Sequence, residues 1–215
     1  MRITQATLHF LPVQTRVPLK FGTETLESVT CARVRLEVVG DDGATAIGWG
    51  ETPLSVQWVW PSPSPYTERE TCLKDFCRSL TSRVVEKSLP GHPIEIGWAF
   101  SEGPLHDLLD SVNADRPADN SMPHLAALVC YSLFDIAAHD AFARLHDRPV
   151  YDCYGPDLGS PDLGTILEPS ETFAGKYVSE LLLPEPRSRM PAWHGGGGLD
   201  ARTADDLDGP APVDG

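Results

Sequence analysis

Basic residues are scarce in this sequence. Its 215 residues include 17 lysines and arginines against 31 aspartates and glutamates, which gives a formal net charge of −14. Proteins that bind nucleic acid or anionic membranes present a basic surface. The charge balance therefore argues against either kind of partner.

Long apolar runs and targeting signals are also missing. Nowhere do 18 apolar residues follow one another, so no transmembrane helix is expected. The N-terminus alternates polar and apolar residues and lacks the apolar region of a signal peptide. The five cysteines form no C-x-x-C pair, and such an odd, scattered set favours reduced, buried thiols over a disulfide framework. We therefore expect a cytoplasmic protein.

Alternating apolar residues dominate the first 51 positions. Residues 4–10 alternate, and residues 28–39 do so more clearly, with Ala32, Val34, Leu36 and Val38 on one face. Residues 40–43 (Gly-Asp-Asp-Gly) form a turn signal, and residues 44–51 supply the returning strand. The pattern predicts an antiparallel three-stranded meander with one solvent-exposed face and with helices packed on the other face.

Three helices are predicted after the strands. Thr67 and Glu70 have the spacing of a capping box, followed by an apolar helix face that ends near residues 89–91. A shorter helix fits residues 104–112, and residues 123–145 form the central helix of an α+β domain. The apolar stripe expected on that helix comprises Leu125, Leu128, Val129, Ser132, Leu133, Ile136, Asp140 and Ala143.

The composition changes after Gly155. The chain holds 20 prolines and 18 glycines, above the usual share, and many of them fall in this part. Too little apolar surface is available there to offset the entropy of ordering. We expect a folded domain over residues 1–155, an irregular linker over 156–194, and a disordered Gly/Asp-rich tail over 195–215.

Four short motifs in register resemble the N-terminal capping domain of the enolase superfamily, of the mandelate racemase and muconate lactonizing type. They are Val-Pro-Leu-Lys-Phe-Gly at 17–22, Gly-Trp-Gly-Glu at 48–51, Leu-Phe-Asp-Ile-Ala-Ala-His-Asp at 133–140, and Arg-Pro-Val-Tyr-Asp-Cys-Tyr-Gly at 148–155. The resemblance covers about residues 1–155. It implies an enolase N-terminal domain-like fold, in which a meander sheet packs on a helical bundle.

In that family the capping domain closes the active site of a (β/α) barrel with two loops. The resemblance places the first loop at Val17–Thr25 and the second at Pro53–Pro65. Such loops cover the substrate and exclude water. An alternative is that their aromatic side chains only pack the loops onto the sheet. The residues implied to cap the substrate are Lys20, Phe21, Gly22, Thr23, Ser55, Trp58 and Trp60.

The family's chemistry lies in the barrel, where a Lys-x-Lys motif and Mg²⁺-binding carboxylates promote proton abstraction next to a carboxylate. The lysines of this chain are Lys20, Lys74, Lys87 and Lys176, with no Lys-x-Lys. A barrel needs at least about 200 residues, more than follow Gly155. No catalytic or metal-binding residue is therefore assigned. Mg²⁺ and a small carboxylate or acid-sugar substrate are expected only in full-length relatives, which act as racemases, dehydratases or cycloisomerases.

The last part of the sequence suggests the approach to such a barrel. Residues 189–194 are a candidate first barrel strand, with Trp193 and His194 as candidate substrate-lining residues. We interpret the chain as a capping domain cut off before its barrel. One alternative is a non-catalytic module that binds either a second copy of itself, as a homo-oligomer, or another protein. Another alternative is that a separate chain supplies the barrel.

Other possible sites are less well supported by the sequence. Asp135 and His139 lie four apart on the predicted central helix, a spacing that can place two metal ligands on one face. Two ligands do not make a site, so a hydrogen-bonding role is favoured. His106, with Asp107 and Asp110, is expected on an exposed acidic helix face. No nucleophile elbow or phosphate-binding loop is found.

Overall fold

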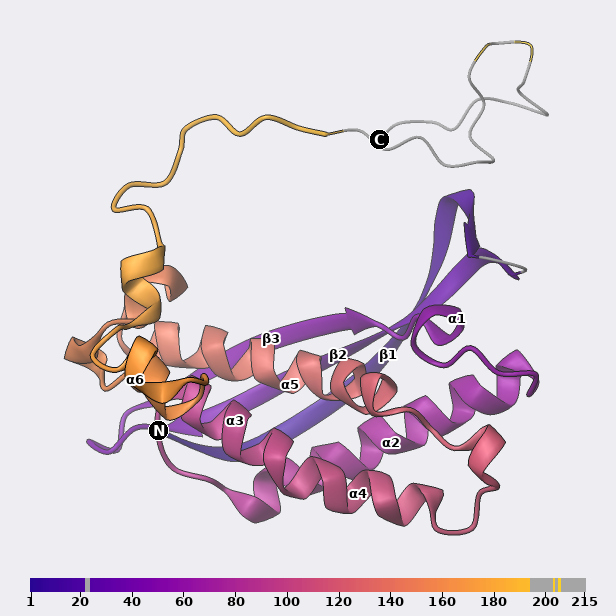
Figure 1. Ribbon diagram of the computed structural model, residues 1–215, viewed down its shortest axis with the longest axis horizontal. Coiled ribbons are helices and arrows are strands. Elements are labelled where there is room, and N and C mark those ends of the chain that lie inside the picture. The colour runs from indigo at the N-terminus through magenta and orange to yellow at the C-terminus, as the bar shows by residue number, and fades with distance from the viewer. Residues whose placement is uncertain (22–23, 194–202, 204, 206–215) are drawn as a thin grey trace.

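The structure is a computed structural model that describes residues 1–21, 24–193, 203 and 205. Three strands come first and helices follow (Figure 1). The strands are β1 (Arg2–Phe21), β2 (Glu24–Val39) and β3 (Thr45–Pro53). The α-helices are α1 (Val56–Val59), α2 (Tyr66–Lys87), α3 (Pro93–Glu102), α4 (Pro104–Asn113), α5 (His124–Leu145) and α6 (Ser170–Phe173). Short 3₁₀ helices span Ala118–Asn120, Val150–Cys153, Pro156–Leu158, Leu163–Thr165 and Val178–Leu181.

The strands form one antiparallel sheet in the order β1-β2-β3, with helices α2 and α5 packed against it (Figure 1). The inward side chains predicted for β2, at positions 32, 34, 36 and 38, are all completely buried. Arg33, between them, is exposed on the other face. Burial of this apolar face against the helices is the main favourable term in such a fold. The predicted α+β meander is therefore confirmed.

The segment predicted as the first capping loop, Val17–Thr25, is largely strand, which corrects the prediction. Strand β1 continues to Phe21 and β2 begins at Glu24, with Lys20 paired to Thr25. The register shifts between Gln14 and Leu19, around a proline that cannot donate a backbone hydrogen bond. Pairing of the two backbones thus extends the hairpin beyond the helices, as Figure 1 shows. The loop was expected only from the family resemblance, which does not show how the two backbones pair.

The predicted capping box of α2 is wrong. The helix begins at Tyr66, and no side chain caps its N-terminus. The Glu70 carboxylate instead accepts a hydrogen bond from Thr30 Oγ1 on β2, at 2.6 Å, and pairs with Lys74 at 3.0 Å. Glu70 thus bonds to Thr30, a residue distant in the sequence, instead of to the backbone at the start of its own helix. The spacing of Thr67 and Glu70 could not reveal this partner.

Helix α3 was not predicted. The helix begins directly after His92, its N-cap residue. The Nδ1 atom of His92 accepts a hydrogen bond from the backbone N–H of Ile94 at 3.2 Å. The Glu95 carboxylate accepts one from the backbone N–H of His92 at 2.9 Å, which completes a capping box. Histidine is not among the usual capping residues, so the start signal was missed.

The central helix is confirmed as α5, but its predicted stripe is partly wrong. Leu125 and Ile136 are 43% and 47% exposed. The buried face consists of Ala126, Ala127, Cys130, Tyr131, Leu133, Phe134, Ala137, Ala138, Ala141, Phe142 and Ala143. Small residues predominate because β3 lies directly on the helix. A Cβ at Gly50 would come within 1.9 Å of the Leu133 carbonyl oxygen.

Helix α5 also covers the free edge of β3. The Asp140 carboxylate accepts a hydrogen bond from the backbone N–H of Trp49 at 2.9 Å, and the hydroxyls of Ser132 and Thr52 are 2.6 Å apart. The first of these bonds satisfies a backbone N–H of the edge strand that would otherwise be open to another strand, and the second joins two side chains. By length and mean hydropathy, residues 118–145 could cross a membrane, but 56% of their most apolar window is buried inside the fold, as in a core helix.

Residues after Cys153 form short helical turns and then an extended segment. Of the predicted barrel strand at 189–194, residues 189–193 have no regular structure and are exposed, and His194 lies outside the described residues. A strand needs a neighbour to satisfy its backbone groups, and none lies beside this segment in the described part of the chain. Of the predicted disordered tail, all but residues 203 and 205 lies outside the described residues.

Candidate functional site

The two predicted capping segments meet at one end of the sheet. The β1–β2 hairpin and the segment from Leu54 to Pro65, which contains α1, lie at the same end in Figure 1. Lys20 is exposed near the hairpin end. Phe21 is the last residue of β1, whereas Gly22 and Thr23 lie outside the described residues. Ser55 directly precedes α1 and is half-buried.

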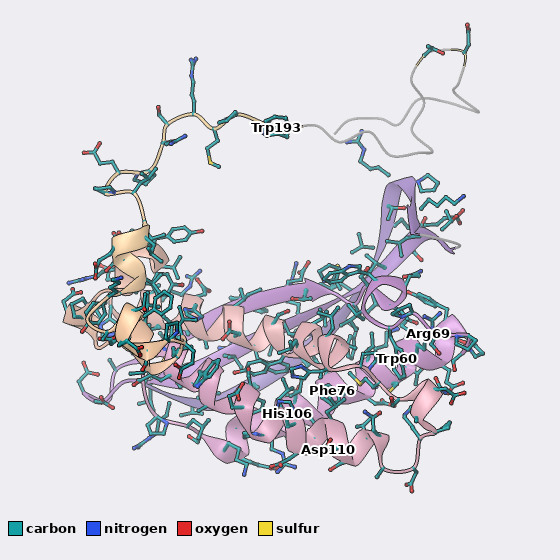
Figure 2. The ribbon with its side chains drawn as sticks, viewed as in Figure 1. Trp60, Arg69, Phe76, His106, Asp110 and Trp193 are labelled. Carbon is teal, nitrogen blue, oxygen red and sulfur yellow. The ribbon has the colours of Figure 1, made fainter. Side chains whose placement is uncertain are left out.

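The two tryptophans of the second segment differ in position. Trp58 is 56% exposed and available to a ligand, whereas Trp60 is 1% exposed and belongs to the core. The buried Arg69 on α2 donates from Nη1 to the Trp60 carbonyl oxygen at 2.6 Å, and the two residues lie together in Figure 2. The guanidinium of Arg116 lies 5.3 Å from the centre of the Trp60 ring. Trp60 therefore anchors the segment, as the packing alternative for these aromatics expects.

A polar pocket of about 550 Å³ lies between the hairpin and this segment. Thr25 lines it from β2, and Ser62 and Ser64 line it from the loop before α2. Both hydroxyls hydrogen-bond to Oδ1 of Asn120, at 3.3 and 2.6 Å. Gln57, on α1, places a buried Oε1 atom at this pocket with no hydrogen-bond partner among the described residues. A buried acceptor without a donor is costly; a bound molecule could supply that donor if the Gln57 side chain turned toward the pocket.

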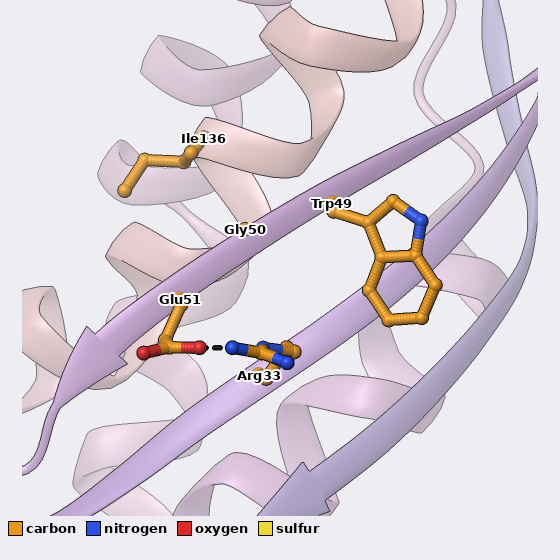
Figure 3. A pocket seen from close by; sticks show the side chains of 5 residues that line it. All are labelled: Arg33, Trp49, Gly50, Glu51 and Ile136. Carbon is orange, nitrogen blue, oxygen red and sulfur yellow. Dashed lines mark hydrogen bonds and ion pairs between the residues drawn. The ribbon is translucent and has the colours of Figure 1, made fainter.

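A second pocket lies on the open face of the sheet beside α5 (Figure 3). It measures about 480 Å³, and Arg33, Trp49, Gly50, Glu51 and Ile136 line it. Arg33 Nε and Glu51 Oε2 are 2.5 Å apart, which ties β2 to β3 on the exposed face. This pair is open to water, so its contribution to stability is small.

Of the candidate metal pair Asp135 and His139, only His139 belongs to a hydrogen-bonded cluster. The closest approach of His139 Nε2 to Asp135 Oδ1 is 3.9 Å, and His139 Nδ1 lies 3.1 Å from the hydroxyl of Tyr154. His92 packs beside them, with Nε2 3.0 Å from the Cys153 carbonyl oxygen. The cluster therefore joins α3 and α5 to the turn after α5. His139 thus has the hydrogen-bonding role that the sequence favoured, whereas Asp135 makes no hydrogen bond to any described residue.

Burial shifts the titration of this cluster. It raises the pKa of the Asp135 carboxyl to about 6 and lowers the pKa of the His139 imidazole to about 4. His139 stays neutral in the fold where the unfolded chain binds a proton, so its contribution to stability is lost as the pH falls below about 6.5. The Asp135 carboxyl has the opposite effect, because its pKa is higher in the fold than in the unfolded chain. Its contribution to stability is present below about pH 4 and is lost as the pH rises.

The remaining predicted site residues stand apart from these pockets. Trp193 is 96% exposed and distant from the helices in Figure 2, and His194 lies outside the described residues. His106 and Asp110 are exposed on α4, as predicted, and the His106 ring stacks on His124 with centroids 4.7 Å apart. Sequence reasoning missed Gln57, His92 and Arg69, since only the tertiary contacts of these residues distinguish them.

Metal binding receives no support from the described part of the chain. Among residues 1–21, 24–193, 203 and 205, no group of three or more His, Cys, Asp or Glu side chains could hold a metal ion. The residues present therefore do not fit the Mg²⁺ site expected of full-length relatives, and no step is assigned to a metal on these residues.

Comparison with known proteins finds similarity only among solved structures. No protein-family model and no curated protein matches the chain. A dipeptide epimerase from Enterococcus faecalis, complexed with Mg and the dipeptide L-Leu-L-Tyr, matches with a TM-score of 0.42 and 16% identity over 73% of this chain and 35% of its own. An N-succinyl Arg/Lys racemase from Bacillus cereus matches with a TM-score of 0.43 and 20% identity over 72% of this chain and 34% of its own.

Several other matches are of the mandelate racemase/muconate lactonizing type. One, from Rubrobacter xylanophilus, has a TM-score of 0.39 and 17% identity over 72% of this chain and 33% of its own. The chain thus spans about a third of the length of the solved structures it resembles. At these identities the likeness says nothing about activity.

Proposed function

We propose that this chain forms the capping domain of an enolase-superfamily enzyme of the mandelate racemase and muconate lactonizing type. One observation carries the proposal: the two segments expected to cap a substrate lie far apart in the sequence, yet share one polar pocket at the end of the sheet. Thr25 comes from the hairpin, and Gln57 comes from the second segment.

The chemistry of this end of the sheet suits a lid. Trp58 offers an exposed ring that can cover an apolar part of a substrate. The unpartnered Oε1 of Gln57 can accept a hydrogen bond from a hydroxyl or amide of the same molecule. Trp60 and Arg69 hold the segment to the body of the domain. The lid would therefore orient the substrate and exclude water, while a barrel carries out the proton transfer.

The proposed substrate is a small carboxylate, such as an acid sugar or an acylated amino acid. Reaction would then begin with removal of the proton next to the carboxylate and end in racemisation, dehydration or cycloisomerisation. Mg²⁺ would bind to the barrel. The same proposal places the enzyme in the cytoplasm, which is supported by five free, buried cysteines.

The decisive experiment starts with the genomic DNA downstream of this coding sequence. We expect a reading frame that continues into a barrel with a Lys-x-Lys strand. The extended protein, with Mg²⁺, should exchange the α-proton of some member of a panel of acid sugars, mandelate and dipeptides for deuterium. The chain by itself should give no turnover. Absence of any barrel frame, or robust turnover by this chain alone, would refute the proposal.

A matched pair of variants in the extended protein tests the lid. Gln57→Leu removes the buried acceptor and should raise KM several-fold. Gln14→Leu makes the same chemical change at an exposed site on β1 and should leave KM unchanged. Equal effects of the two substitutions would show that Gln57 does not face the substrate.

A further inference from the structure

An apolar groove runs between α3 and α5, separate from the capping end of the sheet. It measures about 360 Å³, and Trp98, Leu128, Tyr131 and Ile166 supply much of its lining. Trp98 is 45% exposed, although its large ring would gain from burial. Of the other three, Leu128 and Ile166 are half-buried and Tyr131 is buried. An open apolar groove beside an exposed tryptophan is typical of an interaction surface.

One carboxylate lies in this groove without a cationic partner. Asp135 has no hydrogen-bond donor among the described residues, and its nearest ionisable neighbour is His139 Nε2 at 3.9 Å. That imidazole is held by Tyr154 and is neutral near pH 7. Gly97 leaves room for the carboxylate, since a Cβ there would come within 2.5 Å of Asp135 Oδ1. The groove thus combines apolar walls with a negative charge that lacks a counterion.

The end of the described chain has the complementary properties. Residues 183–193, which we call the arm, are all exposed and make no hydrogen bond to the described remainder of the chain. The last backbone bond before the arm runs from the N–H of Leu182 to the Ser179 carbonyl oxygen. The arm carries Arg187 and Arg189 next to Met190 and Trp193, which are 81% and 96% exposed. It therefore offers cations for the unpaired carboxylate of the groove and apolar side chains for its apolar walls.

The direction of the arm favours a groove on another molecule. Pro184 and Pro186 stand at its root, where each fixes its own φ and cannot donate a backbone hydrogen bond, and the chain bends at residues 184, 185 and 188 before it continues. Figure 1 shows the segment leaving the short helices and running clear of the domain. Fully extended, the arm reaches about 35 Å, enough to cross to a neighbouring domain.

We propose that two copies of this chain exchange arms. The arm of each copy lies in the α3–α5 groove of the other, with Arg187 or Arg189 against Asp135 and the apolar side chains against Trp98 and Leu128. Such an exchange is reciprocal and closes with two-fold symmetry, so it stops at a dimer. The dimer uses neither the hairpin nor the segment after β3, but it shares residues 189–193 with the candidate first barrel strand, so it is tested on this chain without a barrel.

Charge reversal tests the contact in the full chain. Sedimentation equilibrium of the wild type should give twice the monomer mass of 23.4 kDa. Asp135→Arg should raise the dimer dissociation constant about 10- to 100-fold, and so should the double substitution Arg187→Asp with Arg189→Asp. Asp110→Arg reverses an exposed charge on α4, outside the groove, and should have no effect.

Mixing the two weakened proteins gives the sharper result. In a mixed dimer each arm meets a groove of opposite charge, so a one-to-one heterodimer should form at concentrations where each protein alone is monomeric. A monomeric wild type, or a dimer that the arm substitutions leave intact, would overturn the proposal. So would protection of the arm from trypsin in a monomer, which would indicate docking within one chain. If Asp135→Arg unfolds, Asp135→Asn and the arm variants still test the contact.

Discussion

Replacement of Gly50 by alanine is the most direct test of how this domain is packed. Gly50 lies on β3 where the strand crosses α5, and its missing side chain lets the two backbones touch. A Cβ at this position would lie 1.9 Å from the Leu133 carbonyl oxygen and 2.8 Å from the backbone nitrogen of Ala137. Both obstacles are helix backbone, so no side chain can rotate out of the way.

The magnitude follows from the displacement that alanine demands. Ordinary contacts of a Cβ atom begin near 3.4 Å, so the helix must move by more than an ångström from the strand. This movement would open gaps along the alanine face of α5. Overpacking of a well-packed core typically costs 1–3 kcal/mol, and the rigid obstacle places this site at about 3 kcal/mol or more. For a chain of this size, such a loss lowers Tm by about 6–12 °C.

Urea unfolding followed by circular dichroism measures the effect, with Gly103→Ala as the matched control. A Cβ at Gly103 would meet only the Ala99 carbonyl oxygen, at the ordinary distance of 3.5 Å. The control should change the free energy of unfolding by no more than about 1 kcal/mol. If Gly50→Ala unfolds within 1 kcal/mol of the wild type, the close packing of β3 on α5 is refuted.

Three further substitutions probe other contacts. Asp140→Ala deprives the backbone N–H of Trp49 of its acceptor, and because this bond is exposed to water it should lower the free energy of unfolding by about 0.5–1.5 kcal/mol in urea titrations; no change would mean that the bond does not stabilise the edge strand. His139→Gln should reduce the stability lost between pH 7 and pH 5 by about 1–2 kcal/mol in parallel titrations, because the wild-type imidazole resists protonation in the fold; an unchanged pH dependence would contradict its burial. Arg69→Leu removes a donor from the Trp60 carbonyl oxygen and should speed proteolysis of the segment before α2; unaltered cleavage would mean that this bond does not anchor the segment.

Local patterns in the sequence were enough to predict the main elements. Strict alternation in residues 28–39 predicted the buried face of β2, because successive side chains on a strand point to opposite sides. The turn at residues 40–43 and the helices at α4 and α5 followed from equally local signals. The predictions failed where a distant residue decided the outcome, as at Glu70, whose carboxylate bonds to Thr30 instead of capping its own helix.

The candidate sites were less accessible to sequence reasoning. The motif at 17–22 drew attention to the hairpin, but pairing between β1 and β2 made that segment a strand extension. Gln57 and Arg69 carry no sequence signal, since a lone glutamine or arginine has no periodicity. Trp58 and Trp60 were proposed together, yet only the fold separates an exposed ring from a buried one.

By itself, the sequence determined the deficit of basic residues, the order of strands and helices, and which face of each strand is apolar. These properties depend on composition and on neighbours a few residues away. Tertiary structure decided how closely β3 approaches α5 and which carboxylates have hydrogen-bond partners. Among the described residues, Asp135 has none. Tertiary structure also decided that the hairpin and the second segment share one pocket. Such outcomes depend on residues distant in the sequence, whose proximity exists only once the chain has packed.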